Sequence, residues 1–307
     1  MRLSLLDTFI SLIISGFIGN HGVIMDLHNN QTFHLPTKTQ FLSYTLPSQY
    51  NDSIVYIIDE NYEKGSSIFE VSGQNVKTLT HPDVLGAVHI LETQEYLYIP
   101  GFGSNNIWIV DRIKWSTDRV VITGARPHGI YQCQGDIFHV PCRDDDTIRR
   151  YQNTDLSIEL DPIVLVSGSG PRHLDCHDAY YIITEFSCEI IRAHPNGTMD
   201  NIKIIHERSG QGMTGAEIVH RGDVLYVTLR IKDQDGYFLR YDDSSLQETG
   251  RIRVGRTPRF FFIMDDIICV LNQDDQSMML IDPDKWKIMT IISDLPLFPQ
   301  CGFFMRR

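Results

Sequence analysis

An internal repeat is the feature that most constrains how this chain can fold. Five segments share a register, and each opens an apolar stretch at a corresponding position: Ala87, Pro127, Pro171, Ala216 and Pro258. The spacings between these starts are 40, 44, 45 and 42 residues. A second apolar run ends 14 residues after each start. Self-similarity at a fixed period of this size indicates an architecture built from one repeated supersecondary unit.

Each unit is expected to begin with a β-hairpin. Turn-type residues lie about halfway between the two apolar runs: Thr93-Gln94, Gln134-Gly135-Asp136, His177-Asp178, Arg221-Gly222-Asp223 and Asp265-Asp266. The runs that follow them, such as residues 180–184 and 224–228, are rich in β-branched and aromatic residues. This composition favours strands, and polar clusters between such runs are typical of hairpin turns.

The size of the unit predicts an all-β fold, a seven-bladed β-propeller of four-stranded antiparallel blades that occupies residues 1–307 as one domain. Weaker units at residues 53–60 and 9–27 complete the seven. A helical solenoid is disfavoured because no sustained 3.6-residue periodicity is present. The start of the chain, Arg2 followed by an apolar run, is similar to a signal peptide, but Asp7 interrupts the run. We expect a strand over residues 9–15 that shares a blade with Phe303-Phe304 and closes the ring.

The hairpins should bring polar residues to one mouth of the central channel. Residues 14 apart, with the turn midway, are expected to lie side by side at the open end of a hairpin. One position after each repeat start, and at the paired ends, several polar residues occur: His128, Arg172, Glu217, Arg259, Glu60, Glu185, Arg230 and Asn272. They differ from blade to blade, as an asymmetric ligand site requires.

Charge and cysteine content restrict the partners and the compartment. The formal net charge of −12, with no Lys/Arg cluster, argues against nucleic acid, and the apolar start is too short and polar to cross a membrane. An anionic ligand would need arginines concentrated locally against this field. The six cysteines (Cys133, Cys142, Cys176, Cys188, Cys269 and Cys301) show no disulfide-rich spacing. We therefore expect six reduced thiols and a cytoplasmic protein.

Several strings resemble the blade motifs of the lactonase-type seven-bladed propellers, which include 6-phosphogluconolactonases and carboxy-cis,cis-muconate cyclases. They are Arg126-Pro127-His128-Gly129, Gly168-Ser169-Gly170-Pro171-Arg172-His173-Leu174, Gly215-Ala216-Glu217-Ile218 and Leu271-Asn272-Gln273-Asp274. The terminal segment from Pro299 to Phe304 is similar to the family's closing strand. The resemblance covers most of the chain and implies no metal and no organic cofactor.

The resemblance also implies a set of site residues. The cyclase members' His, Glu and two Arg fall on His128, Glu185, Arg172 and Arg230. Glu60, His173, Glu217, Arg259 and Gln273 are further candidates for substrate binding. The sequence departs from the family pattern in two places: the Ser-Asn-Arg string reads Thr228-Leu229-Arg230, and the Asp-Leu-Gly segment reads Cys142-Arg143-Asp144. These departures concern substrate identity more than fold.

Each candidate has a chemical and a structural interpretation. A histidine near neutral pKa suits proton transfer, yet His128 could simply bond a carbonyl at the channel rim. Glu185 could be a second acid or base, or only an ion-pair partner of Arg172. Arginine forks bind carboxylate or phosphate in a bidentate manner, but they also pair with structural carboxylates.

Other motifs exclude further classes of site. The acidic runs Asp144-Asp145-Asp146 and Asp274-Asp275 fit no calcium loop and are explained as turns between blades. The Gly168-Ser169-Gly170 stretch does not open a helix and is no phosphate cradle. No Gly-x-Ser-x-Gly elbow is present. The leading hypothesis is hydrolysis of a small anionic lactone such as 6-phosphogluconolactone by His128 and Glu185. The alternatives are a lactonising cycloisomerase and an inactive propeller that binds proteins.

Overall fold

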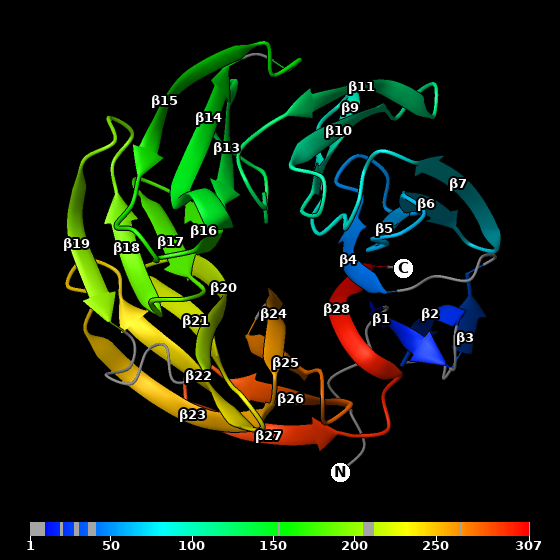
Figure 1. Cartoon of the computed structure of the whole chain (residues 1–307). Helices are drawn as coiled ribbons and strands as arrows, with labels where there is room; N and C mark the ends of the chain where they lie inside the picture. Colours follow the sequence, from blue (N-terminus) through cyan, green and yellow to red (C-terminus); the bar gives the residue numbers. More distant parts are fainter. Residues whose placement is uncertain are drawn as a thin grey trace.

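The fold is a ring of seven β-sheets, seen in the computed structural model of residues 10–18, 21–27, 31–35, 41–152, 154–204, 212–264 and 266–306. Each sheet has four antiparallel strands, and the sheets stand around a central channel as blades (Figure 1). The predicted all-β, seven-bladed propeller is confirmed. Within the described residues no helix has the length and apolar character needed to cross a bilayer.

The strands of each blade run in sequence from the channel outward, except where the two chain ends meet. Blade 1 comprises β28 (Leu297–Arg306), β1 (Ile10–Ile18), β2 (His21–Asp26) and β3 (Gln31–His34). Blade 2 comprises β4 (Leu42–Pro47), β5 (Val55–Asp59), β6 (Ser66–Ser72) and β7 (Asn75–His81). Blade 3 comprises β8 (Leu91–Glu92), β9 (Tyr96–Gly101), β10 (Asn106–Asp111) and β11 (Ser116–Ile122). Blade 4 comprises β12 (Tyr131–Gln134), β13 (Ile137–Cys142), the 3-10 turn η1 (Arg143–Asp145), β14 (Thr147–Gln152) and β15 (Ile158–Val164).

The remaining three blades follow the same order. Blade 5 comprises β16 (Pro171–Cys176), β17 (Tyr180–Thr184), β18 (Glu189–Ala193) and β19 (Met199–Ile204). Blade 6 comprises β20 (Met213–Arg221), β21 (Val224–Ile231), β22 (Gln234–Asp242) and β23 (Glu248–Arg256). Blade 7 comprises β24 (Pro258–Met264), β25 (Ile267–Asn272), β26 (Ser277–Asp282) and β27 (Lys287–Ile292). The predicted hairpin turns lie between the first two strands of blades 3 to 7, with Asp265 outside the described residues.

The ring closes by pairing the two ends of the chain. Strand β1 runs antiparallel to β28, with Ile13 opposite Phe303 and Ile10 opposite Arg306. The predicted closing blade is thus confirmed, with a first strand that extends to Ile18; Phe9, where the prediction began, lies outside the described residues. Closure removes the exposed strand edge that an open ring would leave.

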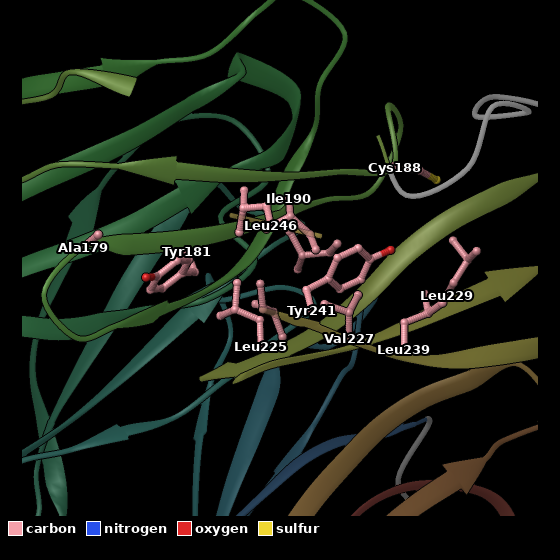
Figure 2. Packing of buried hydrophobic residues seen from close by; sticks show 12 residues of the cluster. Ala179, Tyr181, Cys188, Ile190, Leu225, Val227, Leu229, Leu239, Tyr241 and Leu246 are labelled. Atoms are coloured by element: carbon pink, nitrogen blue, oxygen red, sulfur yellow. The ribbon is translucent and has the colours of Figure 1, made fainter. Parts of the chain in front are cut away.

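The hydrophobic core is divided among the contacts between neighbouring blades. The described residues form seven buried clusters, and each lies between two adjacent blades. Figure 2 shows the cluster between blades 5 and 6, where Tyr181 and Ile190 pack against Leu225 and Tyr241. Ile14 of β1 packs with Cys269 and Leu271 of blade 7, so the core also closes the ring. Full burial of such side chains contributes roughly 1.5–3 kcal/mol each.

A β-bulge marks the start of the innermost strand in four blades. The ladder shifts by one residue between Leu42 and Tyr44, between Pro171 and His173, between Gly215 and Ile218, and between Pro258 and Phe260. In blades 3 and 4 an isolated bridge replaces the first pair of the ladder, at Ala87–Gly101 and Pro127–Cys142. A bulge places two residues opposite one and re-aims the side chains that follow it.

The pairing at the open ends differs from the prediction in three blades. The 14-residue rule holds for Ala87 with Gly101 and for Pro258 with Asn272. It is wrong elsewhere: Pro127 pairs with Cys142, Pro171 with Thr184, and Arg230 with Thr214. The number of residues between paired positions thus varies from blade to blade with the local register of each hairpin, although the same hairpin ends meet.

The cysteines provide a second correction. Cys133 on β12 and Cys176 on β16 form a disulfide, with Cα atoms 5.3 Å apart, so the prediction of six reduced thiols is wrong. The two residues are 43 positions apart, about one repeat, and therefore occupy corresponding places on the inner strands of neighbouring blades. Cys142, Cys188, Cys269 and Cys301 are free and buried. A cytoplasmic location stays a prediction and is no longer supported by thiol chemistry.

Candidate active site

The bulged ends of the inner strands form one mouth of the channel. A small cavity there is lined by Ser43, Tyr44, Val88, His128, Arg172, His173, Glu217, Arg259 and Phe260. Three pairs in this set are consecutive in sequence, for example Arg172 with His173 and Arg259 with Phe260. Consecutive side chains of a regular strand point to opposite faces, so it is the bulge that lets both line the same cavity.

Glu185 is the centre of an arginine cluster at this mouth. It follows β17, and its carboxylate lies 3.3 Å from Arg172 Nη1, 3.2 Å from Arg230 Nη2 and 3.5 Å from Arg143 Nη1. Burial favours the neutral acid, but the three guanidinium groups outweigh it and lower the pKa of Glu185 to about 2. The carboxylate is therefore ionised at any ordinary pH, which agrees with the ion-pair interpretation.

The arginines have further partners that fix their direction. Arg172 Nε donates to the carbonyl of Ala216 at 3.1 Å, and Arg230 Nη2 donates to the carbonyl of Gly215 at 3.4 Å. Burial lowers the pKa of Arg230 to about 9, with a further contribution from the charge of Arg172. The Nε atom of Arg230 is buried and has no hydrogen-bond partner among the described residues. A buried donor without a partner costs free energy.

A second ion pair lies on the opposite side of the mouth. Arg259 Nη2 is 3.8 Å from Glu60 Oε2, and the hydroxyl of Tyr62 donates to Glu60 Oε1 at 2.6 Å. Burial lowers the pKa of Arg259, and the nearby charge of Arg172 lowers it further. Four arginines thus meet two ion-paired glutamates, an excess of positive charge in a protein whose formal net charge is −12.

His128 reaches the cavity from blade 4. Its backbone N–H donates to Pro141 O at 2.9 Å, and its ring contacts Phe102 and His173 at centroid distances of 5.5 and 4.8 Å. Burial lowers the pKa of His128 well below 6.5, and the charge of Arg172 lowers it further. The imidazole is therefore neutral, and its buried Nδ1 has no partner among the described residues. Nδ1 therefore gives no support to the interpretation that the His128 side chain bonds a carbonyl at the channel rim.

Glu217 and His173 lie deeper in the channel. His173 Nδ1 is 2.6 Å from the hydroxyl of Tyr131 and 3.8 Å from Glu217 Oε1. Burial raises the pKa of Glu217 to about 8, because the charge of Arg172 only partly offsets the loss of solvation. At neutral pH Glu217 is therefore a protonated carboxylic acid.

The structure brings most predicted residues to one place. His128, Arg172, His173, Glu217 and Arg259 line the cavity. Glu185 forms ion pairs with Arg172 and Arg230, and Glu60 forms one with Arg259. Gln273 is buried after β25, with its backbone N–H bonded to Thr257 O at 3.0 Å, and does not line this cavity. The acidic turn at Asp146 binds backbone: its carboxylate accepts hydrogen bonds from the N–H groups of Gly168 and Gly170.

Arg143 is the residue that sequence reasoning did not select. It lies in η1, pairs with Glu185, and its guanidinium stacks between the rings of Phe102 (4.6 Å) and Phe186 (5.0 Å). The available signal was the Cys142-Arg143-Asp144 string, where the chain departs from the family motif. Within the described part of the chain no group of His, Cys, Asp or Glu side chains is arranged to hold a metal ion.

The closed ring of seven blades defines a β-propeller, and polar side chains gather around a cavity at one mouth of its channel. Residues 49–290 match the sequence profile of the lactonase, seven-bladed β-propeller family. The chain belongs to this family. No curated protein sequence gives a significant match.

Solved structures resemble the chain over nearly its full length. A candidate 6-phosphogluconolactonase of Bacteroides fragilis is 16% identical, with a TM-score of 0.78 over 98% of this chain and 99% of that one. The periplasmic gluconolactonase of Pseudomonas aeruginosa is 15% identical, with a TM-score of 0.77 over 97% and 99%. A protein of Lactobacillus plantarum is 18% identical, with a TM-score of 0.75 over 97% and 99%. At these identities the likeness concerns the fold.

Proposed function

We propose that this protein hydrolyses a small lactone that carries a carboxylate or phosphate group. The observation that carries the proposal is the arginine cluster around Glu185, which lies beside a neutral histidine at the channel mouth. Membership of the lactonase family supports hydrolysis of a lactone ring. The named activity of the Pseudomonas aeruginosa structure, a gluconolactonase, supports a sugar-derived ring as one option.

In this proposal the arginines bind the anion and stabilise the reaction's negative charge. The planar forks of Arg172 and Arg230 suit two-point binding of carboxylate or phosphate, and Arg259 approaches from the other side. A remaining N–H group would stabilise the oxyanion that forms when water adds to the lactone carbonyl. Glu185 is assigned a positioning role, because a carboxylate with a pKa of about 2 cannot hold a proton for transfer.

His128 is assigned the role of general base. The attacking water gives its proton to the unpartnered Nδ1 of the neutral ring, and its oxygen bonds to the lactone carbonyl carbon. The bond from that carbon to the ring oxygen then breaks, and the protonated Glu217 supplies the proton for the leaving alkoxide. A bound anion would offset the arginine charges that lower the pKa of His128, so substrate itself strengthens the base.

A lactone panel tests the proposal. We measure the acid released on hydrolysis of four lactones: 6-phosphogluconolactone, gluconolactone, a carboxylated muconolactone and a neutral butyrolactone. We expect saturable turnover of at least one anionic lactone, with kcat/KM at least tenfold above that of its neutral counterpart. Arg230→Met should remove this preference, whereas Arg253→Met, at an exposed ion pair on β23, should keep it. Preference for neutral lactones would contradict the proposal.

A cycloisomerase is the second candidate, because the structure groups Arg172, Glu185 and Arg230 with His128, the residue types that the cyclases combine. In that reaction a substrate carboxylate adds to a carbon–carbon double bond and an acid protonates the other carbon. Incubation with a carboxymuconate distinguishes the two: lactone formation from the open acid indicates the cyclase. Absence of turnover with the whole panel and with carboxymuconate would favour the protein-binding alternative.

A further inference from the structure

A second and larger cavity occupies the opposite end of the channel. Its volume is about 530 Å³, within the range typical of small-molecule sites. It shares Tyr44, His173, Glu217 and Phe260 with the arginine mouth, so these four side chains separate the two spaces. Its lining also includes His89, Tyr131, Asp175, Val219, Arg221 and Phe262.

Aromatic rings dominate the inner part of this cavity. Tyr44 lies edge-on to Phe260 at a centroid distance of 6.1 Å, and Phe260 lies 6.3 Å from Phe262 on the same strand. The ring of His89 contacts those of Tyr44 at 4.4 Å and Tyr131 at 5.0 Å. Such walls favour a flat ring as ligand, because offset and edge-to-face contacts stabilise aromatic pairs beyond their buried area.

The polar groups of the inner part are uncharged. Burial lowers the pKa of His89 to about 3 and that of His173 well below its usual value. Glu217, with its raised pKa, is a neutral acid here. The charged side chains, Asp175 and Arg221, belong to the outer part, where the Asp175 carboxylate already accepts from the backbone N–H groups of Cys176 and His220. Among the described residues, the inner wall therefore offers no positively charged side chain to an anion.

One polar atom in the cavity wall lacks a partner. His89 is 6% exposed, lines the cavity, and its buried Nδ1 has no hydrogen bond among the described residues. A buried polar atom without a partner costs free energy, so its presence in a cavity wall points to a ligand group that completes it. A hydroxyl or a carbonyl on the ligand can do so, according to the tautomer of the imidazole.

We propose that this second cavity binds a neutral, planar aromatic molecule with a hydroxyl or carbonyl group, at a site separate from the arginine mouth. The ring lies among Tyr44, Tyr131 and Phe262, and its polar group bonds His89 Nδ1. The ligands of the lactone site and of this site would differ in both charge and shape. The proposal does not depend on lactone hydrolysis, which is measured separately on the same preparations.

Binding of 1-naphthol by isothermal calorimetry tests the site. We expect saturable binding of one molecule per chain, at least tenfold tighter than that of the non-planar decahydro-1-naphthol. Val219→Trp should abolish binding because it fills the cavity. Val224→Trp is the matched control, because Val224 packs in the same cluster between blades 6 and 7 but does not line the cavity. His89→Phe should weaken binding roughly three- to tenfold, the effect of one lost hydrogen bond.

The location of binding separates this proposal from the lactone site. Arg230→Met should bind 1-naphthol as the wild type does. No saturable binding, or binding that Arg230→Met removes and Val219→Trp keeps, would overturn the proposal. Crystals of the wild-type protein soaked with 4-bromo-1-naphthol give a readout that needs no variant. Anomalous bromine signal among Tyr131, Val219 and Phe262 supports the site; signal elsewhere, or none, contradicts it.

Discussion

The two ends of the central channel are built from the same inner strands and have opposite chemistry. At the bulged ends, guanidinium groups and ionised carboxylates meet, with Glu185 paired to Arg143, Arg172 and Arg230. At the other ends, aromatic rings and the neutral imidazoles of His89 and His173 line a larger cavity, and the Cys133–Cys176 disulfide joins two adjacent inner strands. One end is held by charge and the other by packing and a covalent link.

The difference teaches what a bulge does in a closed propeller. Regular pairing would alternate side chains along the inner strand. The bulges at Arg172 and Arg259 instead add a long cation next to His173 and Phe260 without moving the rest of the strand. The charged mouth is therefore a local addition to an apolar channel, and changes at one end should leave the other largely intact.

Removal of the disulfide should have the largest effect on stability. The bond closes a loop of 43 residues, and loop entropy assigns about 4 kcal/mol to such a link. Urea unfolding of the Cys133→Ser, Cys176→Ser double variant should show this loss relative to the oxidised wild type, while the kcat of lactone hydrolysis stays within twofold. Rapid alkylation of Cys133 and Cys176 in the native, unreduced protein would disprove the bond.

Glu217→Gln should increase stability at neutral and higher pH. The folded pKa of Glu217 is raised from 4.5 to about 8, so the native state binds more protons than the unfolded state between these values. Stability of the wild type therefore falls as pH rises through this window, and by pH 7 the cost is about 3 kcal/mol. Glutamine does not titrate and should remove this slope. Nearly equal stability of the two proteins at pH 4 and divergence at pH 7 would bear this out; parallel pH profiles would contradict it.

His128→Asn should reduce kcat for lactone hydrolysis by about a hundredfold or more, the usual contribution of an acid–base residue. Folding should be unchanged, and so should binding of 1-naphthol at the other end. His177→Asn is the control, because His177 lies exposed at the hairpin turn of blade 5. Wild-type turnover in the His128→Asn protein would remove His128 from the proposed mechanism.

Arg172→Lys should have the smallest of these effects, a rise in KM of about tenfold with a lesser change in kcat. The charge remains, but the fork that contacts Glu185 and Ala216 is lost. Steady-state kinetics on the preferred anionic lactone provide the measurement, with Arg253→Lys as control. A fall in kcat with KM unchanged would assign Arg172 to the transition state instead of to binding of the anion.

The propeller could be predicted from the sequence because its repeat is local. Turn residues and β-rich runs recur within each unit of 40 to 45 residues, and each hairpin forms between neighbours in the chain. Closure by β1 and β28 follows from the exposed edge that an open ring would leave. The same register identified His128, Arg172 and Glu217, because corresponding positions in successive blades must point to one channel.

Features that depend on neighbouring blades could be decided only by the tertiary structure. Pro127 pairs with Cys142 and Pro171 with Thr184, departing from the 14-residue rule, since the exact register of a hairpin leaves no signal in an apolar strand. Burial determined the protonation of His128 and Glu217, because desolvation depends on what packs around a group and not on its sequence neighbours. The repeat period already placed Cys133 and Cys176 at corresponding positions, but their bond required knowing how closely two inner strands approach.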